Sequence, residues 1–580
     1  MFGSQPLRVP VGQDAHRWST FPAERTLVVA ARTVTSTVRI LETLPGLLRG
    51  DHRVAVVFAY DHTSAFNAGV LDLLHAAGCR VMPWEQLKDV RPDLVLTASE
   101  NVEVPEGDYP VLVLPHGIGF QKLVPDARSP RERLSGVVPD ALLETGRAWL
   151  AVSHPAQEEQ LLASHPKAAG RTLLVGDPCF DEIVASLPRR DDYRDALGLA
   201  AHQRLVVVSS TWGPTSLLGR HPDLPARLLG QLPFDAYRVA AVVHPNVWSA
   251  HAAWQIRALQ AAALDGGLLL MPAVHAWRAA LVAADVVIGD HGSVTLYGAS
   301  AGKPVLLAAL GRDAVAGTAV HDLAAAAPRL DPRGDVLGQV EDVVREHRPD
   351  RYAAAAGHAF AERGQALARI RAALYQLLRL PEPSAAPPAP PLLPVPEPPG
   401  APVASWQVTT AVSSADGQPT VVVQRVPAAV CPTGAKDTVC PAGAEDAEQP
   451  SSCTHLACSD GERDTRLLES ASVILQQRCA PTTVGALRWL RDTLARFPGS
   501  LAAVTAVRAE SCLVALRDGR VVEAVATGLG RDPGLAAAVV YAGLRARFPL
   551  DGTWVTLRIA GVGDEDVFLR LRPSPLGDGD

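Results

Sequence analysis

Two histidines stand where apolar runs of the sequence end, a position from which an imidazole can reach a bound ligand. His116 follows the run Val111–Leu114, and His244 follows Val239–Val243. An imidazole titrates near neutral pH and can take a proton from a hydroxyl or donate a hydrogen bond to a phosphate. We therefore treat His116 and His244 as candidate catalytic residues. The alternative is that each only forms a hydrogen bond at a strand end.

A third apolar run, Val286–Ile288, ends in the segment GDHGSVT, which covers residues 289–295. The spacing after Gly292 predicts the first turn of a helix, whose free N–H groups and dipole favour an anion such as a phosphate. This segment supplies most of the candidate donor-binding residues: Asp290, Gly292, Ser293, Val294 and Thr295. The alternative is an N-cap followed by a glycine that is needed only for close packing.

A fourth polar segment, Thr211-Trp212, follows the run Val206–Val208 and adds two candidate donor-binding residues. Trp212 could stack on a base. Three further residues could assist an anion, namely Arg278, His291 and Lys303. Lys303 precedes a proline and also suits a helix C-terminus. We expect neither a metal ion nor a cofactor.

Parallel sheets must position these segments. Up to about residue 380, short apolar strands alternate with amphipathic helices, a pattern typical of sheets covered on both faces. Two blocks of about six strands, on either side of Gly176-Asp177-Pro178, predict two Rossmann-type domains facing each other across a cleft. Ligands bind beyond the carboxyl ends of such strands, where the four polar segments fall.

We expect an α/β fold with seven regions. They are an N-terminal tail at 1–24, a first lobe at 25–165, a second lobe at 166–380 whose segment 350–380 crosses back, a mobile Pro-rich linker at 381–403, a hairpin at 404–430, a flexible cysteine-containing loop at 431–462, and a small α+β domain at 463–580. The last domain includes a helix at Pro533–Phe548, and 404–580 is expected to fold independently of the lobes.

The composition excludes several classes of function. The chain has 580 residues, 48% apolar and 20% charged, with a net charge of −7, which indicates a globular protein of several domains. No basic field would attract nucleic acid. The sequence shows no secretory signal and no run of ~20 apolar residues that could span a membrane. We expect a cytoplasmic protein, and peripheral membrane contact stays open.

Four cysteines, Cys431, Cys440, Cys453 and Cys458, fall close together around His455. Four thiolates can hold zinc, but structural zinc sites use more closely spaced cysteine pairs. We therefore expect an unstructured loop, with a zinc site as the alternative.

The polar segments resemble, in order and spacing, those of the CDP-glycerol glycerophosphotransferases, the wall teichoic acid polymerases and primases. The resemblance covers roughly residues 25–380 and rests on the segments His116-Gly117, Gly176-Asp177-Pro178 with Asp181, Thr211-Trp212, His244-Pro245, Asp290 to Val294, and Gly302-Lys303-Pro304-Val305. It implies a GT-B fold, a nucleotide-activated donor in the second lobe and a hydroxyl acceptor, such as a cell-wall polymer precursor, beside the first. It also implies that His116 is the base and that His244 lies near the phosphates.

The sequence departs from that family at Ile118, Gly213 and His291-Gly292, where the family has threonine, arginine and Tyr-Ser. These departures leave two alternatives to a transferase. One is a catalytically degenerate scaffold that binds a nucleotide. The other is an enzyme similar to UDP-N-acetylglucosamine 2-epimerases, for which Asp61 and Glu100 are the candidate acid and base.

The chain also looks like an actinobacterial family often labelled a translation initiation factor. A GTPase needs the motif Gly-x4-Gly-Lys-Ser/Thr. The nearest segment, residues 298–304, is one residue too short and has Pro304 where Mg²⁺ requires a hydroxyl. We therefore reject a GTPase.

Overall fold

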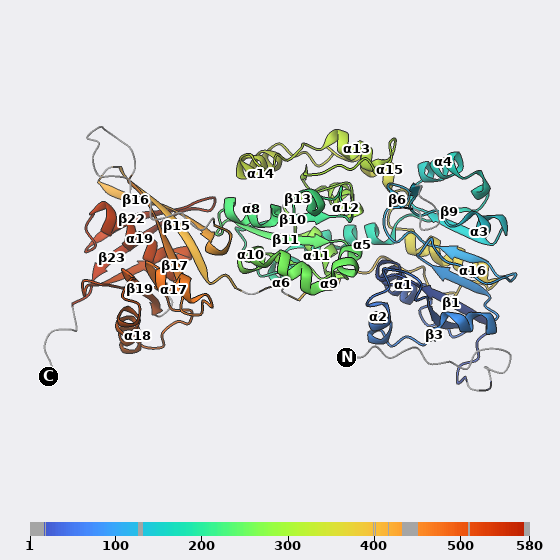
Figure 1. Cartoon of the computed structure of the whole chain (residues 1–580), viewed down its shortest axis with the longest axis horizontal. Helices are drawn as coiled ribbons and strands as arrows, with labels where there is room; N and C mark the ends of the chain where they lie inside the picture. Colours follow the sequence, from blue (N-terminus) through green and yellow to red (C-terminus); the bar gives the residue numbers. More distant parts are fainter. Residues whose placement is uncertain are drawn as a thin grey trace.

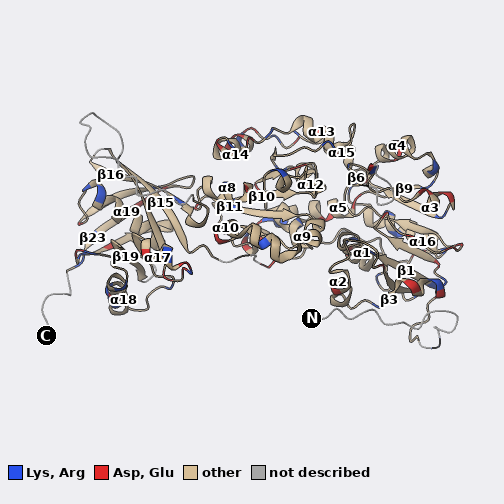
Figure 2. Ribbon diagram, viewed as in Figure 1, with Lys and Arg blue, Asp and Glu red and all other residues tan. Residues whose placement is uncertain are grey.

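The computed structural model describes residues 17, 19–125, 132–397, 400, 402–415, 417–431, 451–507 and 511–573. Two lobes, each built on a parallel sheet, and a C-terminal barrel lie in a row (Figure 1). Acidic and basic residues are interspersed over all three units (Figure 2). Within the described ranges, no helix has the length and apolar character needed to cross a membrane.

The first lobe contains a seven-stranded parallel sheet in the order β3-β2-β1-β4-β5-β8-β9. Its strands are β1 (Arg25–Ala31), β2 (Val54–Tyr60), β3 (Val81–Pro83), β4 (Leu94–Thr97), β5 (Val111–Val113), β8 (Ala148–Val152) and β9 (Thr172–Leu174). Helices α1 (Val34–Leu47), α2 (Val70–Ala76) and α4 (Pro155–Ser164) follow strands of this sheet, and α3 (Asp140–Glu144) precedes β8. A two-stranded hairpin, β6 (Leu123–Pro125) with β7 (Glu132–Leu134), extends from this lobe.

The second lobe contains a five-stranded parallel sheet in the order β12-β11-β10-β13-β14. Its strands are β10 (Arg204–Ser210), β11 (Tyr237–Val243), β12 (Leu269–Leu270), β13 (Val286–Gly289) and β14 (Val305–Leu307). Its longer helices are α5 (Pro178–Ser186), α8 (Leu224–Gln231), α9 (Pro245–Leu259), α11 (Ala276–Ala283), α12 (Ser293–Ser300), α13 (Ala319–Ala326) and α14 (Val336–Arg345). Both sheets are apolar throughout because helices cover both faces.

The connection between the lobes lies further along the chain than the sequence predicted. We expected the segment around β9 in the second lobe, but β9 pairs with β8 at the edge of the first sheet. Gly176 follows with a φ of +84°, and a Cβ there would lie 3.2 Å from the Ala361 carbonyl oxygen. The chain then returns through α16 (Ala366–Leu378), whose Leu367, Ile370 and Leu374 are buried in the core of the first lobe.

The segment predicted as a mobile linker is docked on the lobes over its described part. Leu393 is buried in the core of the second lobe; its N–H donates to Ser186 Oγ (3.0 Å), and its carbonyl accepts from the Tyr193 hydroxyl (2.9 Å). Arg371 on α16 pairs with Glu382 (3.0 Å). A proline-rich chain makes no hydrogen bonds with itself, so its backbone groups remain free for such partners.

The C-terminal region is a closed nine-stranded barrel, which corrects the expected separate hairpin, flexible loop and small α+β domain. Its strands are β15 (Ser405–Ala415), β16 (Gln418–Pro427), β17 (Ser451–Ser459), β18 (Val473–Leu475), β19 (Ala502–Val507), β20 (Ser511–Leu516), β21 (Val521–Ala526), β22 (Thr553–Ile559) and β23 (Gly563–Leu571). Strand β17, expected to be flexible, pairs with β15 over eight residues. Residues 432–450 lie outside the described residues, as do 1–16 of the expected tail.

Helix α19 (Pro533–Ala546) fills the barrel: its residues 534–543 are all buried and share one core with all nine strands. The shorter α17 (Thr465–Ser470) packs against β17, and α18 (Thr483–Arg496) packs against β19 and β20. The α18 contacts form a second, smaller core around Ala486 and Leu490. A barrel of this kind has no free edge strand.

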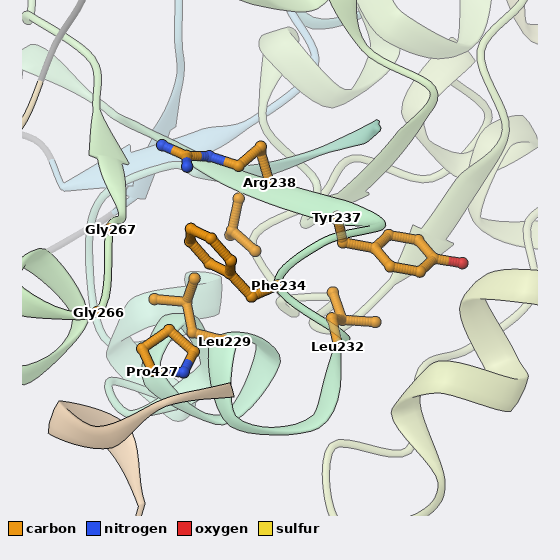
Figure 3. Close-up of a pocket in the computed structure, with 9 residues that line it drawn as sticks. Leu229, Leu232, Phe234, Tyr237, Arg238, Gly266, Gly267 and Pro427 are labelled. Carbon is orange, nitrogen blue, oxygen red and sulfur yellow. The ribbon is translucent and has the colours of Figure 1, made fainter. Parts of the chain in front are cut away.

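The barrel is fixed to the second lobe. Arg425 on β16 pairs with Asp235 of the second lobe (2.5 Å) and with Asp532, which caps α19 (2.7 Å). Its carbonyl accepts a hydrogen bond from the Phe234 N–H (2.8 Å). Figure 3 shows Pro427 of the barrel next to Leu229, with Phe234 close by, in a small crevice at this junction. The barrel therefore packs against the second lobe, and the independent folding of residues 404–580 stays a prediction.

Candidate functional site

A cavity of about 820 Å³ lies between the two lobes, at the carboxyl ends of both parallel sheets. In each sheet the strand order reverses at one point, which lies between β1 and β4 in the first lobe and between β10 and β13 in the second. Residues that follow each of these four strands line the cavity. Open α/β sheets bind ligands at such points. The predicted site residues that line the cavity are His116, Thr211, Trp212, His244, His291, Gly292, Ser293 and Val294.

His116 lies on the loop after β5, and its side chain is 32% exposed. Its Nδ1 is 3.1 Å from the carbonyl oxygen of Ala98, on the loop after the adjacent strand β4. A carbonyl oxygen only accepts hydrogen bonds, so Nδ1 carries the proton. In the neutral ring Nε2 then holds a lone pair. The local geometry therefore leaves His116 able to accept a proton at Nε2.

His244 lies at the other side of the cavity and has the opposite arrangement. It caps helix α9, and its Nδ1 accepts a hydrogen bond from the Asn246 N–H (3.1 Å). In the neutral ring the proton is therefore on Nε2, which makes Nε2 a donor. Burial, with smaller contributions from His116 and Lys122 nearby, lowers the pKa of His244 to about 3. His244 is thus neutral at physiological pH.

Asp290, predicted to bind the donor, instead organises the loops around it. It is fully buried. One carboxylate oxygen accepts from the N–H groups of Thr211 (2.9 Å) and Leu217 (2.8 Å), and the other accepts from the Gly292 N–H (2.9 Å). Burial raises the pKa of Asp290, and these three bonds oppose that shift. Asp290 thereby fixes the Thr211 loop against the start of α12.

Helix α12 begins at the cavity with Ser293 and Val294. The Ser293 hydroxyl accepts a hydrogen bond from the Ile118 N–H (3.3 Å), so the loop that carries His116 meets the start of this helix across the lobes. Thr295, a predicted donor-binding residue, is buried, and its hydroxyl donates to Ser209 Oγ (3.4 Å). The structure thus places Thr295 beneath the site.

Trp212 contacts the first lobe across the cavity. Its ring centroid is 6.2 Å from that of Phe66, and the Lys122 ammonium lies 4.7 Å from it. Lys122 also donates to the Trp212 carbonyl (3.0 Å) and pairs with Asp313 (3.2 Å). His291 contacts the same Asp313 through Nε2 (3.1 Å). His291 therefore helps to position Asp313 for its ion pair with Lys122, which joins the two lobes.

Two of the predicted cations lie outside the cavity. Arg278, on α11, is buried and pairs with Glu42 of the first lobe and Glu182 of α5. Lys303 donates to the carbonyl oxygens of Val282 (2.7 Å) and Ala284 (2.9 Å) at the end of α11. Carbonyl groups at a helix C-terminus attract a cation, so Lys303 caps this helix.

The arginine and lysine side chains that line the cavity are already paired. The pairs are Arg32–Asp61 (3.0 Å), Arg39–Asp177 (3.7 Å), Lys122–Asp313 (3.2 Å) and Arg133–Glu100 (3.2 Å). A bound anion would therefore depend on neutral donors and on helix N-termini more than on a free cation.

The sequence did not single out Lys122, Arg133, Arg39 or Tyr297, which also line the cavity. Arg39 donates to the His116 carbonyl (3.4 Å), and the Tyr297 hydroxyl donates to Asp177 (2.6 Å). Each of these side chains acts through a residue that is distant in sequence. The one available signal was the position of Arg39 and Tyr297 on helices that directly follow sheet strands.

The cysteines do not gather. Alternation along β17 places Cys453 toward the barrel interior and Cys458 beneath α17, on opposite faces of the sheet. Cys440 lies outside the described residues. Among the residues that the structure describes, no group of three or more histidine, cysteine or acidic side chains could hold a metal ion.

Comparisons with known proteins gave only distant structural similarity. The sequence matches no protein-family model and no curated protein. A structure of the wall teichoic acid polymerase TagF is 12% identical, with a TM-score of 0.41, and the match covers 62% of this chain and 90% of that one.

Two other solved structures cover 61% of this chain and 99% of their own. They are the UDP-GlcNAc 2-epimerase from Neisseria meningitidis bound to UDP-GlcNAc (13% identity, TM-score 0.39) and a glycosyltransferase from Rickettsia africae (10% identity, TM-score 0.36). All three TM-scores lie below 0.5, so the two-lobed α/β fold of this chain rests on its own strand order and inter-lobe cavity.

Proposed function

We propose that the inter-lobe cavity binds a nucleotide-activated donor and transfers its polyol-phosphate or sugar group to a hydroxyl acceptor. One observation carries the proposal. His116 and His244 line the same cavity from opposite lobes, one with a lone pair at Nε2 and the other with a proton there. A hydroxyl nucleophile needs a base, and the phosphate next to the reacting centre needs a donor.

In the proposed reaction, the acceptor oxygen attacks the transferred group, and its proton passes to His116 Nε2. For a donor such as CDP-glycerol, a new P–O bond forms at the phosphorus that carries glycerol. The bond between the two phosphates breaks, and the nucleoside monophosphate leaves. For a nucleotide sugar, attack occurs at the anomeric carbon and a nucleoside diphosphate leaves. Neutral His244 donates to a phosphate oxygen in either case.

On the donor side, the start of α12 supplies N–H groups and the Ser293 hydroxyl. Gly292 lies beside Thr211: a Cβ at Gly292 would lie 3.0 Å from both Thr211 Cβ and the Asp290 carboxylate. A side chain there would be crowded against these two residues, so glycine allows the Thr211 loop to pack closely against the start of α12. Val294 and Trp212 complete this side. The donor stays defined only as a nucleotide-activated compound.

Two alternatives have specific observations behind them. A scaffold that only binds a nucleotide is favoured by the paired state of the cavity cations and by glycine at position 213. An epimerase-like enzyme would use Asp61 and Glu100. Asp61 is engaged by Arg32 and by the Thr63 hydroxyl (2.7 Å), and Glu100 by Arg133, so both carboxylates accept hydrogen bonds from donors of the protein itself. That arrangement suits a base but leaves no acid partner.

The test is a panel of CDP-glycerol, CDP-ribitol and UDP-sugars, incubated with and without hydroxyl acceptors. Transfer or donor hydrolysis supports a transferase, epimerisation supports the second alternative, and binding without turnover supports a scaffold. Replacing His116 by alanine should lower turnover by about 10²–10⁴-fold and leave donor affinity within a few-fold. The control is His165→Ala, because His165 is only partly buried and lies outside the cavity. Full activity of His116→Ala would refute its role as base.

A further inference from the structure

The acid nearest to the His116 ring is Glu100, on the loop after β4. Its side chain is only 10% exposed, and its Oε2 lies 3.8 Å from His116 Nδ1. Its other oxygen, Oε1, accepts a hydrogen bond from Arg133 Nη2 (3.2 Å). The two carboxylate oxygens thus have different partners, one an arginine and the other the side of His116 that carries the proton.

We propose that Glu100 is a positioning residue for His116: it lies beside the Nδ1 side of the ring and stabilises the imidazolium that forms when His116 takes a proton at Nε2. The base role of His116 rests on the proposed function, but the ion pair does not. A carboxylate beside a histidine favours the charged ring, whereas the Ala98 carbonyl fixes the tautomer of the neutral ring. Glu100 therefore acts through His116 and exchanges no proton with substrate.

The orientation of Glu100 is itself fixed by the hairpin β6–β7. Arg133 lies on β7, which pairs with β6. At the start of β6, the Leu123 N–H donates to the Asp313 carbonyl (2.8 Å), and Lys122 forms a bridge with Ala314 of the second lobe. The arginine that engages Glu100 is thereby held in place from both lobes.

Arg39, Lys122 and His244 also lie near His116, and the acids Glu42, Asp61 and Glu103 line the same cavity. Arg39 of α1 donates to the His116 carbonyl (3.4 Å), and His116 and Lys122 both lie close enough to His244 to lower its pKa. Although burial would raise the pKa of Glu100, the charges of His116 and Arg133 keep it below its ordinary value. Glu100 is therefore ionised and is the counter-ion for the protonated ring.

The test is Glu100→Gln, which keeps the shape and removes the charge. Proton titration of the labelled His116 ring, followed by NMR in the full chain, should have its midpoint about one pH unit or more lower in the variant. Where turnover is detected, the acidic limb of the pH–rate profile should move the same way, and kcat should fall about 10-fold or more with donor KM within a few-fold. Glu100→Asp should give an intermediate midpoint.

The matched control is Glu85→Gln. Glu85 also faces a histidine Nδ1, that of His62, at 3.6 Å, but both side chains are more than 60% exposed and neither lines the cavity. That variant should leave the His116 titration unchanged. An unchanged His116 midpoint in Glu100→Gln would overturn the proposal, even if the enzyme turns over. A shifted midpoint in a protein that never transfers any donor would uphold the ion pair and remove the proposed function instead.

Discussion

Replacing His455 by phenylalanine should remove acid sensitivity from the barrel. His455 lies on β17 with its side chain completely buried, and its ring stacks on Tyr541 of α19 with centroids 4.0 Å apart. Among the described residues, neither ring nitrogen has a hydrogen-bond partner. Phenylalanine preserves the stacking and removes two buried polar atoms that have no partner, each of which costs about 1–3 kcal/mol.

The size of the pH effect follows from the burial. Burial, with a smaller contribution from the charge of Arg545, lowers the pKa of His455 to about 3. In the unfolded chain a histidine has a pKa of about 6.5, so as the pH falls from about 6.5 towards 3 the unfolded state takes up the proton first. Stability is therefore lost over this range. At pH 4.5, two units below the unfolded value, the loss is about 2.7 kcal/mol.

The assay is hydrogen exchange of the barrel strands in the full chain at pH 7.5 and 4.5, since a chain of several units does not unfold in one step. The wild type should lose about 2.7 kcal/mol more opening free energy between these pH values than His455→Phe. His321→Phe, at an exposed position on α13, should behave like the wild type. An equal pH dependence in wild type and His455→Phe would show that His455 is not the neutral, buried group described above.

Other variants probe the cavity and the barrel junction. Saturating nucleotide, at 100 times its Kd, should stabilise the wild type by about 2.7 kcal/mol and so raise its melting temperature. Ser293→Asp should abolish this rise because the added negative charge would repel the phosphate. A rise that is retained in the variant would show that the nucleotide binds elsewhere. His244→Ala should weaken donor binding, measured by calorimetry, by about 10-fold, the effect of losing one neutral hydrogen bond. Arg425→Met should destabilise the barrel junction by about 3–5 kcal/mol in hydrogen exchange, because it leaves Asp235 buried without its partner; unchanged exchange there would contradict a fixed barrel.

Hydrophobic patterns in the sequence predicted individual strands and helices better than they predicted which of these elements contact one another. The runs before His116, His244 and Gly292 are strands of two separate parallel sheets, and these residues line one cavity. Helix α19 spans 533–546, close to the predicted 533–548. These features follow from hydrophobic periodicity and from the rule that polar groups after parallel strands share an edge.

Contacts between distant segments were not predictable in this way. Strand β17 has polar residues on its outer face, such as Ser452 and Thr454, so its sequence alone indicates a loop. Its pairing with β15, which is distant in sequence, makes it a strand. Asp290 and Asp313 organise the cavity through bonds to loops that no sequence spacing links to them. For the same reason, Arg278 and Lys303 were predicted as possible phosphate ligands. In the structure Arg278 pairs with acids of two other helices, and Lys303 caps the end of α11.

The docked proline-rich segment and the Arg425 junction change what the barrel can contribute. A domain on a flexible linker can take many positions, and the length of the linker sets its effective concentration at a neighbouring binding site. Here the second lobe lies between the first lobe and the barrel (Figure 1). The Arg425 ion pair and the docked Leu393 hold the barrel and its linker in one orientation. Only a partner long enough to extend past the second lobe could touch the barrel and the cavity together.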